Sequence, residues 1–446
     1  MRDIEKFIVK GRKKLIGKIR VSGSKNVALK VLVAACLTDE EVVVENVPLI
    51  TDFLIMTEII EQLGGVVKRK DHSYSIKLKE FSGNKIFLDK AAEIRTSFMF
   101  LAPLLARERS ALIPNPGGCR IGARPIGRIV NGLQKMGVKI DYEREDGYFH
   151  ARTGKDGLTG TEYAFSKNSH TGTETMLLAA VLAKGKTVLK NAAEEPEVDE
   201  LIDLLNKMGA KIKRTKPRVI EIQGVKKLHG VKFKIGPDRN EVVTFAVAAI
   251  MTRGDILVED IKKESIKEFL EKLDEIGAGY KIEKNGIRFF GNGKLKSTDI
   301  ITNFYPGFMT DWQGPWTILM TQAFGVSKVH ETVYENRFTY VDELNKMGSD
   351  IRLFNPVLKN PAKVYNFNIT DDNNYYHAVE ITGPVVLHNA AVNIADLRAG
   401  ATLVIAALAA RGESVIFGIE HLDRGYENFE KRLLSLGANI KRVTHE

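Results

Sequence analysis

The loop PNPGGCRIGARPIG at residues 114–127 contains Cys119, one of only two cysteines in the chain. No apolar run flanks this thiol, and Arg120 and Arg124 follow it closely. Nearby guanidinium groups favour the thiolate form of a cysteine, and the glycines and prolines allow the turns of a loop that can close as a lid. Cys36, within KVLVAACL, has instead the surroundings of a small buried hydrophobe. The sequence therefore predicts a reactive thiol at Cys119.

Basic residues recur at or just before the expected helix starts, an end where the helix dipole disfavours a cation by about 0.3–1 kcal/mol. Any one of them is explained by solvent or by a nearby carboxylate such as Asp238, Glu335, Asp396 or Asp423. Seven together indicate a polyanionic ligand held by helix N-termini and guanidinium groups. The seven are Lys25, Arg95, Arg124, Arg239, Arg337, Arg398 and Arg424.

These cations fall at corresponding points of an internal repeat. Six segments read as an amphipathic helix, a glycine and a short β-like run, and the glycines are spaced by 73, 72, 68, 71 and 89 residues. Each glycine is expected where a helix turns left-handed before a strand. The last spacing is longer because the stretch within 354–377 looks inserted. The six glycines are Gly64, Gly137, Gly209, Gly277, Gly348 and Gly437.

Each repeat also contains a second helix that is apolar on nearly every face, which is typical of a buried helix. The repeat therefore combines one buried helix, one half-exposed helix and several short strands. This predicts an α+β (α/β) chain of six copies, three in each of two domains. A cleft between two such domains is the default binding site.

Composition narrows the class of protein. With 446 residues, 44% hydrophobic and 27% charged, the chain suits a globular protein of two or three domains. The longest apolar run, 399–410, is shorter than the roughly 20 residues of a membrane helix, and the N-terminus does not resemble a secretory signal. Two cysteines fit a reducing cytoplasm. The net charge of +10 suits either nucleic acid or a small anionic substrate; without basic blocks or stacking aromatics, the second is favoured.

Six motifs in one order now identify a family. The chain resembles the UDP-N-acetylglucosamine 1-carboxyvinyltransferases from about residue 5 to residue 443. The resemblance implies an inside-out α/β barrel of βαβαββ units, with one domain at 25–236 and the other formed by 1–24 and 237–446. The motifs are GSKN (23–26), PGGCRIGARP (116–125), TDWQ (310–313), ENRF (335–338), ADLRAGA (395–401) and HLDRGYE (421–427).

The reaction implied by this resemblance moves the enolpyruvyl group of phosphoenolpyruvate to the 3′-hydroxyl of UDP-N-acetylglucosamine and releases phosphate through a ketal intermediate. Cys119 is then the acid that protonates the methylene carbon, and it is alkylated by fosfomycin in the family. Asp311 is the expected base for the attacking hydroxyl. It is also a candidate N-cap of the following helix, and both roles can hold together. No metal or other cofactor is expected, because phosphoenolpyruvate carries the reactive group.

The resemblance also assigns binding residues. Lys25, Arg124 and Arg424 hold the phosphate and carboxylate of phosphoenolpyruvate, and Lys25 is also expected to be catalytic. Asn26 faces the acceptor sugar and contacts phosphoenolpyruvate. Arg95, Arg337 and the catalytic Arg398 complete the cationic lining, with Asp396 as an anchor for Arg398. The remaining substrate-binding residues are Pro125, Ile126, Ser169, Thr171 and Gly172.

The sequence departs from the family at the expected nucleotide pocket. Ile126, Gly127 and Arg128 stand where an aspartate usually recognises uracil, and the segment 166–175 carries an extra residue. Loss of a polar contact changes specificity, so an enolpyruvyl transferase with another nucleotide or nucleotide-sugar acceptor remains an alternative. A second alternative is a non-catalytic nucleic-acid or scaffold protein. Neither a nucleic acid nor a membrane is the expected partner, and the oligomeric state is open.

Overall fold

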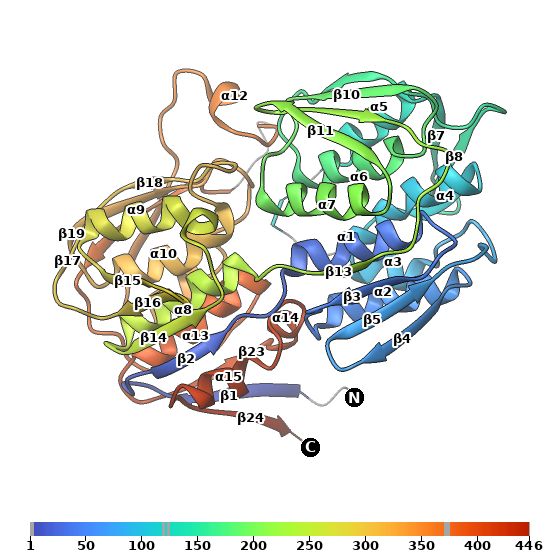
Figure 1. Cartoon of the computed structure of the whole chain (residues 1–446). Helices are drawn as coiled ribbons and strands as arrows, with labels where there is room; N and C mark the ends of the chain where they lie inside the picture. Colours follow the sequence, from blue (N-terminus) through green and yellow to red (C-terminus); the bar gives the residue numbers. More distant parts are fainter. Residues whose placement is uncertain (1–3, 118–120, 123–124, 370–374, 446) are drawn as a thin grey trace. The chain divides into compact units, whose positions relative to one another are not determined.

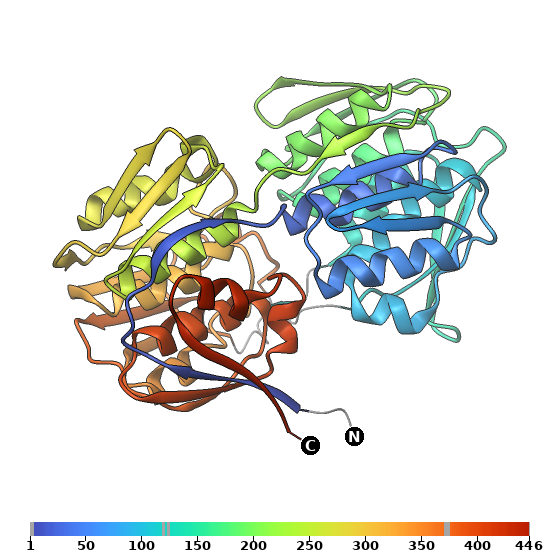
Figure 2. The same cartoon turned by 60° about the horizontal axis from the view of Figure 1, so that its bottom comes forward.

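The computed structural model of the chain describes residues 4–117, 121–122, 125–369 and 375–445, and these divide into two compact units (Figures 1 and 2). Unit 1 consists of Met1–Ser22, Arg120–Arg124 and Pro237–Glu446. Unit 2 consists of Gly23–Cys119 and Pro125–Gly236. Unit 1 is thus formed by the two ends of the chain together with residues 120–124, and unit 2 by the remaining residues between them.

Unit 2 contains three small sheets and the helices that cover them. Its helices are α1 (Lys25–Ala35), α2 (Thr51–Gln62), α3 (Leu88–Glu93), η1 (Arg95–Phe100), α4 (Leu101–Arg107), α5 (Gly127–Lys135), α6 (His170–Ala180) and α7 (Pro196–Lys207). Its strands are β3 (Val42–Glu45), β4 (Val66–Lys70), β5 (Ser73–Lys77), β6 (Ser110–Pro114), β7 (Val138–Glu143), β8 (Tyr148–Thr153), β9 (Glu162–Ala164), β10 (Lys186–Lys190), β11 (Lys211–Lys216), β12 (Val219–Gln223) and β13 (Lys232–Lys234).

Unit 1 has the same kind of architecture. Its helices are α8 (Arg239–Met251), η2 (Lys263–Ile266), α9 (Lys267–Ile276), η3 (Thr310–Trp312), α10 (Gln313–Met320), α11 (Val341–Lys346), α12 (Pro361–Val364), α13 (Leu397–Ala409), α14 (Glu420–Asp423) and α15 (Phe429–Ser435). Its strands are β1 (Ile4–Lys10), β2 (Ile16–Arg20), β14 (Asp255–Glu259), β15 (Gly279–Glu283), β16 (Gly286–Phe290), β17 (Leu295–Lys296), β18 (Ile300–Ile301), β19 (Ala323–His330), β20 (Asp350–Phe354), β21 (Ala378–Gly383), β22 (Ala391–Asn393), β23 (Glu413–Phe417) and β24 (Asn439–His445).

One sheet pattern recurs in both units. Five sheets join a parallel pair to two antiparallel strands, in the orders β13-β3-β5-β4, β9-β10-β12-β11, β2-β14-β16-β15, β17-β19-β21-β20 and β22-β23-β1-β24. The sixth, β6-β8-β7, has a single parallel bridge, Lys85 to Leu112, where the fourth strand would lie. The N-terminal strand β1 completes the last sheet by pairing with β23 and β24 (Figure 1). The described residues therefore contain the six copies that the sequence predicts.

The buried helices of the repeat form the centre of each unit. In unit 1, α8, α10 and α13 contact one another, and every residue of α8 is buried. In unit 2, α1 contacts η1 and α6, and α6 packs against α4. The expected second buried helix of unit 2 begins as the 3-10 helix η1 rather than as an α-helix. Burying apolar helices inside a shell of sheets is what brings their N-terminal residues to defined positions.

The six repeat glycines have the predicted backbone conformation. Their φ angles lie between 72° and 102°, the left-handed region that glycine tolerates best. Two repeats add a matching side-chain device in the sequence NKMG. The amide of Asn206 pairs with both backbone groups of Ile212, and Asn345 does the same with Ile351. These bonds fix the angle between the half-exposed helix and the strand that follows it.

Glu200 of α7 holds the residue at which the chain leaves unit 2. Its Oε1 accepts a hydrogen bond from the Gly236 N–H at 2.5 Å, and the Gly236 carbonyl accepts one from the Ser24 N–H at 2.8 Å. Burial raises the pKa of Glu200 to about 7, against the lowering effect of the Gly236 bond and with additional raising by Glu197 and Asp203. The folded protein therefore keeps a proton on this carboxyl at pH values where the unfolded chain has lost it.

Because the raised pKa favours folding only while Glu200 is protonated, stability falls as pH rises from about 4.5 to about 7. We expect the free energy of unfolding of the unsubstituted protein to fall by about 2 to 3 kcal/mol more between pH 5 and pH 8 than that of Glu200→Gln. Gln keeps the acceptor for Gly236 and cannot ionise. Urea unfolding at the two pH values measures the difference, with exposed Glu145→Gln of the same unit as the control. Equal pH dependence in all three proteins would contradict the prediction.

Candidate active site

Asp311 is the centre of an ionic cluster in unit 1. It lies in η3, and its carboxylate contacts Arg337 (Nη2 to Oδ1, 3.0 Å), Arg398 (Nη2 to Oδ2, 3.3 Å) and Asn240 (Nδ2 to Oδ2, 3.5 Å). The two guanidinium side chains are 5% and 8% exposed, whereas the Asp311 side chain is 25% exposed. The carboxylate is therefore held by buried cations and still has access to solvent.

The pKa of Asp311 reflects this setting. Burial raises it, but the charges of Arg398 and Arg337, with a smaller effect from Arg239, outweigh burial and lower the pKa to about 2. Asp311 is therefore ionised throughout the neutral range and able to accept a proton. A carboxylate of such low pKa is a weak base as long as both cations neutralise it.

Arg398 takes its position from the first turn of α13. Asp396 caps this helix, its Oδ1 accepting hydrogen bonds from the N–H groups of Arg398 (2.9 Å) and Ala399 (3.2 Å). The guanidinium Nη1 of Arg398 donates to the Tyr426 hydroxyl at 3.2 Å. Asp396 thus anchors Arg398 through the backbone of the helix, and the charge partner of the side chain is Asp311.

Arg337 is positioned by a loop rather than by a helix. Its Nη2 also donates to the Thr310 carbonyl at 3.0 Å, next to Asp311. Thr310 in turn donates its hydroxyl to Glu331 Oε2 at 2.8 Å, and Glu331 is completely buried. Burial raises the pKa of Glu331, although the Arg337 charge opposes this.

Arg239 begins α8, where Asp238 caps the helix by accepting hydrogen bonds from the N–H groups of Asn240 and Glu241. The Arg239 guanidinium lies over the rings of Tyr305 and Trp312, 5.4 and 5.6 Å from their centroids. The helix start therefore has the cation that the sequence predicts, with its cap in place.

Two cations do not lie where the helix-dipole interpretation places them. Arg424 directly follows α14, at a helix C-terminus where the dipole favours a cation, so that interpretation is wrong for Arg424. Arg337 precedes α11 by four residues and lies outside its first turn. Asp423 pairs with Arg442 through two hydrogen bonds of 2.9 and 2.7 Å. Neither Arg424 nor Arg337 therefore lies in the first turn of a helix.

The alternative role of Asp311 as an N-cap is also wrong. Met309 is the residue before η3, with no side-chain cap, and the Asp311 carboxylate is used by the arginines. Pro315 does occur in the first turn of α10, as expected. Sequence reasoning missed Asn240, Tyr426, Thr310 and Glu331 as members of the cluster. Two of these residues could have been found from the sequence, because Asn240 follows Arg239 and Tyr426 lies within the motif HLDRGYE.

In unit 2, the predicted site residues again occur at helix starts. Lys25 and Asn26 are the first two residues of α1, and the Lys25 ammonium contacts Asp52 Oδ2 at 2.8 Å. Arg95 is the first residue of η1. Pro125 and Ile126 precede α5, and the Ile126 carbonyl accepts the first hydrogen bonds of that helix.

The segment expected to hold the diphosphate of the nucleotide forms the N-terminus of α6. Ser169 is the N-cap, and its hydroxyl accepts a hydrogen bond from the Gly172 N–H at 3.1 Å. Thr171 and Gly172 lie in the first turn. Arg128 of α5 reaches this segment, where its Nη1 donates to the Asn168 carbonyl at 3.0 Å.

Cys119, Arg120 and Arg124 lie outside the described residues, and the described parts of their loop explain its glycines. Gly117 lies within unit 2, where a Cβ atom would come within 1.7 Å of the Ala92 carbonyl oxygen. Gly122 has a φ of 144°, and a Cβ there would meet the Glu335 carboxylate. The Ile121 carbonyl accepts a hydrogen bond from the Asn336 N–H at 3.1 Å within unit 1. Gly117 and residues 121–122 are thus each held by close contacts within their own unit.

Cys36 is the buried cysteine that the sequence predicts. It is the C-cap residue of α1 and is fully buried. Its Sγ donates a hydrogen bond to the Leu32 carbonyl at 3.4 Å, and burial raises the pKa of the thiol to about 12. Such a thiol is unreactive at neutral pH.

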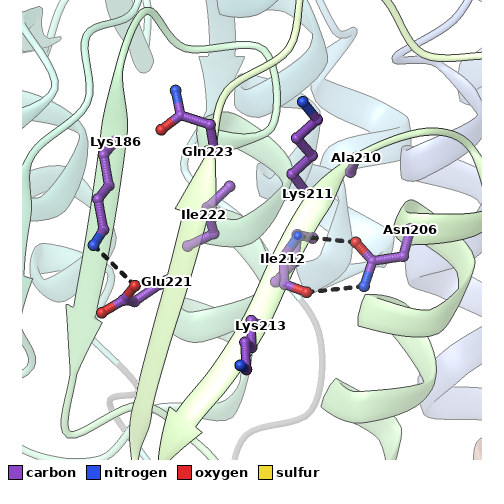
Figure 3. A pocket seen from close by; sticks show the side chains of 9 residues that line it. All are labelled: Lys186, Asn206, Ala210, Lys211, Ile212, Lys213, Glu221, Ile222 and Gln223. Atoms are coloured by element: carbon purple, nitrogen blue, oxygen red, sulfur yellow. Dashed lines mark hydrogen bonds and ion pairs between the residues drawn. The ribbon is translucent and has the colours of Figure 1, made fainter.

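A surface hollow in unit 2 is a different kind of feature (Figure 3). It has a volume of about 550 Å³ and lies over β10, β11 and β12. Its Lys186 pairs with Glu221 at 2.8 Å, and its Asn206 is used by the backbone of Ile212. These polar groups therefore bind one another or the backbone and stabilise the fold.

Among the residues that the structure describes, none of the helices has the length and apolarity needed to cross a bilayer. The same residues contain no group of three or more histidine, cysteine, aspartate or glutamate side chains arranged for a metal ion.

The known proteins that this chain resembles in sequence are carboxyvinyltransferases. Residues 9–433 match the family model of EPSP synthase (3-phosphoshikimate 1-carboxyvinyltransferase). The UDP-N-acetylglucosamine 1-carboxyvinyltransferase of Koribacter versatilis is 39% identical over 444 residues, covering 99% of this chain and 97% of that protein. The protein of the same name from Acidobacterium capsulatum is 40% identical over 447 residues, covering 99% and 96%.

Solved structures show the same fold. The enolpyruvyl transferase NikO from Streptomyces tendae matches with a TM-score of 0.86 and 22% identity, covering 100% of both chains. EPSP synthase from Acinetobacter baumannii matches with a TM-score of 0.71 and 18% identity, covering 99% of this chain and 100% of that one. The predicted mixed α/β fold of the enolpyruvyl transferases is thereby confirmed.

Proposed function

Because the chain belongs to the enolpyruvyl transferase family that includes the UDP-N-acetylglucosamine 1-carboxyvinyltransferases, we propose that it transfers the enolpyruvyl group of phosphoenolpyruvate to the 3′-hydroxyl of UDP-N-acetylglucosamine. This is the first committed step of peptidoglycan synthesis. The reaction would take place in the cytoplasm, and its product would be used for the cell wall that maintains cell shape and is built during division. The observation that supports it most strongly is the carboxylate of Asp311 between the guanidinium groups of Arg337 and Arg398.

The proposed reaction has two stages. In the first, Asp311 accepts the proton of the acceptor hydroxyl, and the hydroxyl oxygen forms a bond to C2 of phosphoenolpyruvate. Cys119 donates a proton to the methylene carbon. In the second, the C2–O bond to phosphate breaks and the phosphate takes the proton held by Asp311, while a proton of the new methyl group returns to the Cys119 thiolate as the double bond re-forms. Asp311 and Cys119 thus end in the protonation states in which they began, and no oxidant or reductant is consumed.

The negative charge of a bound substrate would make Asp311 a stronger base. In the ligand-free site, Arg398 and Arg337 lower the pKa of Asp311 to about 2. An anionic substrate that binds these guanidinium groups takes up part of their positive potential, and the pKa of Asp311 then rises toward the range where a carboxylate is an effective base. The same substrate charge opposes the thiolate form of Cys119 and keeps its proton available.

The remaining roles are assigned from the family resemblance. Lys25, Arg124 and Arg424 are assigned to the phosphate and carboxylate of phosphoenolpyruvate, and Asn26 and Arg95 to the substrates. The N-terminus of α6, with Ser169, Thr171 and Gly172, suits a diphosphate because its N–H groups and dipole attract anions. Pro125 and Ile126 border the nucleoside.

The test is phosphate release from phosphoenolpyruvate with a panel of acceptors. We expect turnover with UDP-N-acetylglucosamine and little or none with shikimate 3-phosphate or other nucleotide sugars. Turnover with only one of the others would contradict the acceptor assignment and leave the enolpyruvyl chemistry intact. No turnover with any acceptor would contradict both.

A further inference from the structure

The inserted segment between β20 and β21 contains the short helix α12 (Figure 1). A cluster of four rings anchors this segment in unit 1. Tyr365 stacks on Phe367 with centroids 4.8 Å apart, and His377 lies 5.0 and 4.9 Å from these two rings. His330 of β19 completes the ring cluster, its Nε2 lying 3.1 Å from the Tyr365 hydroxyl. The Tyr365, Phe367 and His377 residues are only 4–7% exposed. Burial of three rings is typical of a packed element rather than of a surface loop.

The ring cluster holds the loop 331–337, which carries Arg337. The His377 carbonyl accepts a hydrogen bond from the Glu331 N–H at 2.8 Å, and the Thr332 carbonyl accepts one from the Asn366 N–H at 2.8 Å. Burial lowers the pKa of His377, opposed by a hydrogen bond between His377 and the backbone of Glu335. The insertion therefore contacts the loop 331–337 near both of its ends.

Glu331 connects the loop 331–337 to Thr310, the residue before Asp311. Its Oε1 accepts hydrogen bonds from the N–H groups of Val333 (2.8 Å) and Tyr334 (3.1 Å), and its Oε2 accepts the Thr310 hydroxyl. A fully buried carboxylate with three donors is rigid, because any displacement leaves buried polar groups without partners. The backbone next to Asp311 is thus tied to the same loop that carries Arg337.

The loop 331–337 has one more contact of interest. Its Asn336 N–H donates to the Ile121 carbonyl at 3.1 Å, and Gly122 approaches Glu335. Residues 121–122 belong to the loop that contains Cys119. The segment held by the ring cluster therefore contacts the sequence neighbours of Cys119 as well as Asp311.

We propose that the insertion supplies positioning residues, with His377 and Phe367 as its key members, that hold Arg337 in contact with Asp311. This inference rests on the proposed function, because it assigns the geometry of the base in that reaction. A displacement of about 1 Å at a reacting group costs as much as 10²-fold in rate. The ring cluster therefore contributes to kcat without touching either substrate.

The first measurement uses Phe367→Ala, which removes one ring of the cluster, with Val357→Ala as the matched control. Val357 lies in the same insertion and is fully exposed. We expect Phe367→Ala to lower kcat by about 10- to 100-fold and to leave the KM of both substrates within about threefold. The control should match the parent in both constants.

The pH profile separates positioning from stability. Arg398, Arg337 and Arg239 are the charges that face Asp311 and lower its pKa. When Arg337 moves away, the acidic limb of the kcat profile should shift upward by about 0.5 to 1 pH unit. His377→Phe serves as the second variant, since it keeps an aromatic ring and removes the bond to Glu335. A lower Tm with an unmoved acidic limb in both folded variants would overturn the proposal.

A readout without turnover separates this inference from the proposed function. Hydrogen exchange at the amides of Val333 and Tyr334, both bound to Glu331, should be faster in Phe367→Ala and His377→Phe and unchanged in Val357→Ala. If the parent lacks the proposed activity, faster exchange still supports the positioning role of the insertion. Unchanged exchange in both variants would overturn that role whatever the activity.

Discussion

Asp311→Asn is expected to lower kcat with phosphoenolpyruvate and UDP-N-acetylglucosamine by about 10²–10⁴-fold, the contribution of a positioned general base. Asn has nearly the same shape as Asp, and its amide cannot accept the proton of the attacking hydroxyl. The substitution also removes the negative charge that Arg337 and Arg398 share. Phosphate release under saturating substrates measures the loss.

Ligand binding provides the internal check on this prediction. Without the Asp311 charge, the two guanidinium groups should bind inorganic phosphate at least as tightly as in the parent, so a folded variant combines lost turnover with retained anion binding. Asp350→Asn, an exposed carboxylate of the same unit, is the control and should match the parent. A kcat for Asp311→Asn within threefold of the parent would exclude Asp311 as the base.

Cys119→Ala is expected to have a comparable effect, a loss of about 10²–10⁴-fold in turnover, because the methylene carbon loses its proton donor. The same variant should resist alkylation by fosfomycin, whereas the parent should gain a single adduct by mass spectrometry. Unimpaired turnover by Cys119→Ala would mean that another group delivers the proton.

Cys36→Ala is the matched control because it is the other cysteine of the chain. Its thiol is fully buried, with a pKa raised to about 12, so it should neither react with fosfomycin nor take part in catalysis. We expect normal turnover and a modest loss of stability of about 1 kcal/mol from the small cavity. A fosfomycin adduct on Cys36 in the parent would contradict the reactivity assigned to each thiol.

The repeat and its helix starts could be predicted from the sequence because they depend on local rules. Glycine is the residue that tolerates a left-handed helix end, and the six repeat glycines all adopt it. Capping is local in the same way, since Ser169, Asp238 and Asp396 accept hydrogen bonds from N–H groups two or three residues ahead. These local features determine where Arg239 and Arg398 lie.

The parts that could not be predicted depend on contacts between distant residues. The Thr310 to Glu331 bond and the packing of His330 on Tyr365 join residues 21 and 35 positions apart, with no periodic signal between them. Arg424 was misplaced because a helix dipole was assumed where the chain has the end of α14. The pairing of β1 with β24 likewise joins the two ends of the chain.

The most direct test of the account is the fate of hydrogen in the reaction run in D₂O. If a proton is added to the methylene carbon and another is later removed, the vinyl group of the product must contain deuterium, and NMR of the product with UDP-N-acetylglucosamine should detect it. Cys119→Ala or Asp311→Asn incubated for the same time should accumulate about 10²–10⁴-fold less deuterated product. Phosphate release by the parent with no deuterium in the vinyl group would contradict the addition and elimination chemistry assigned to this site.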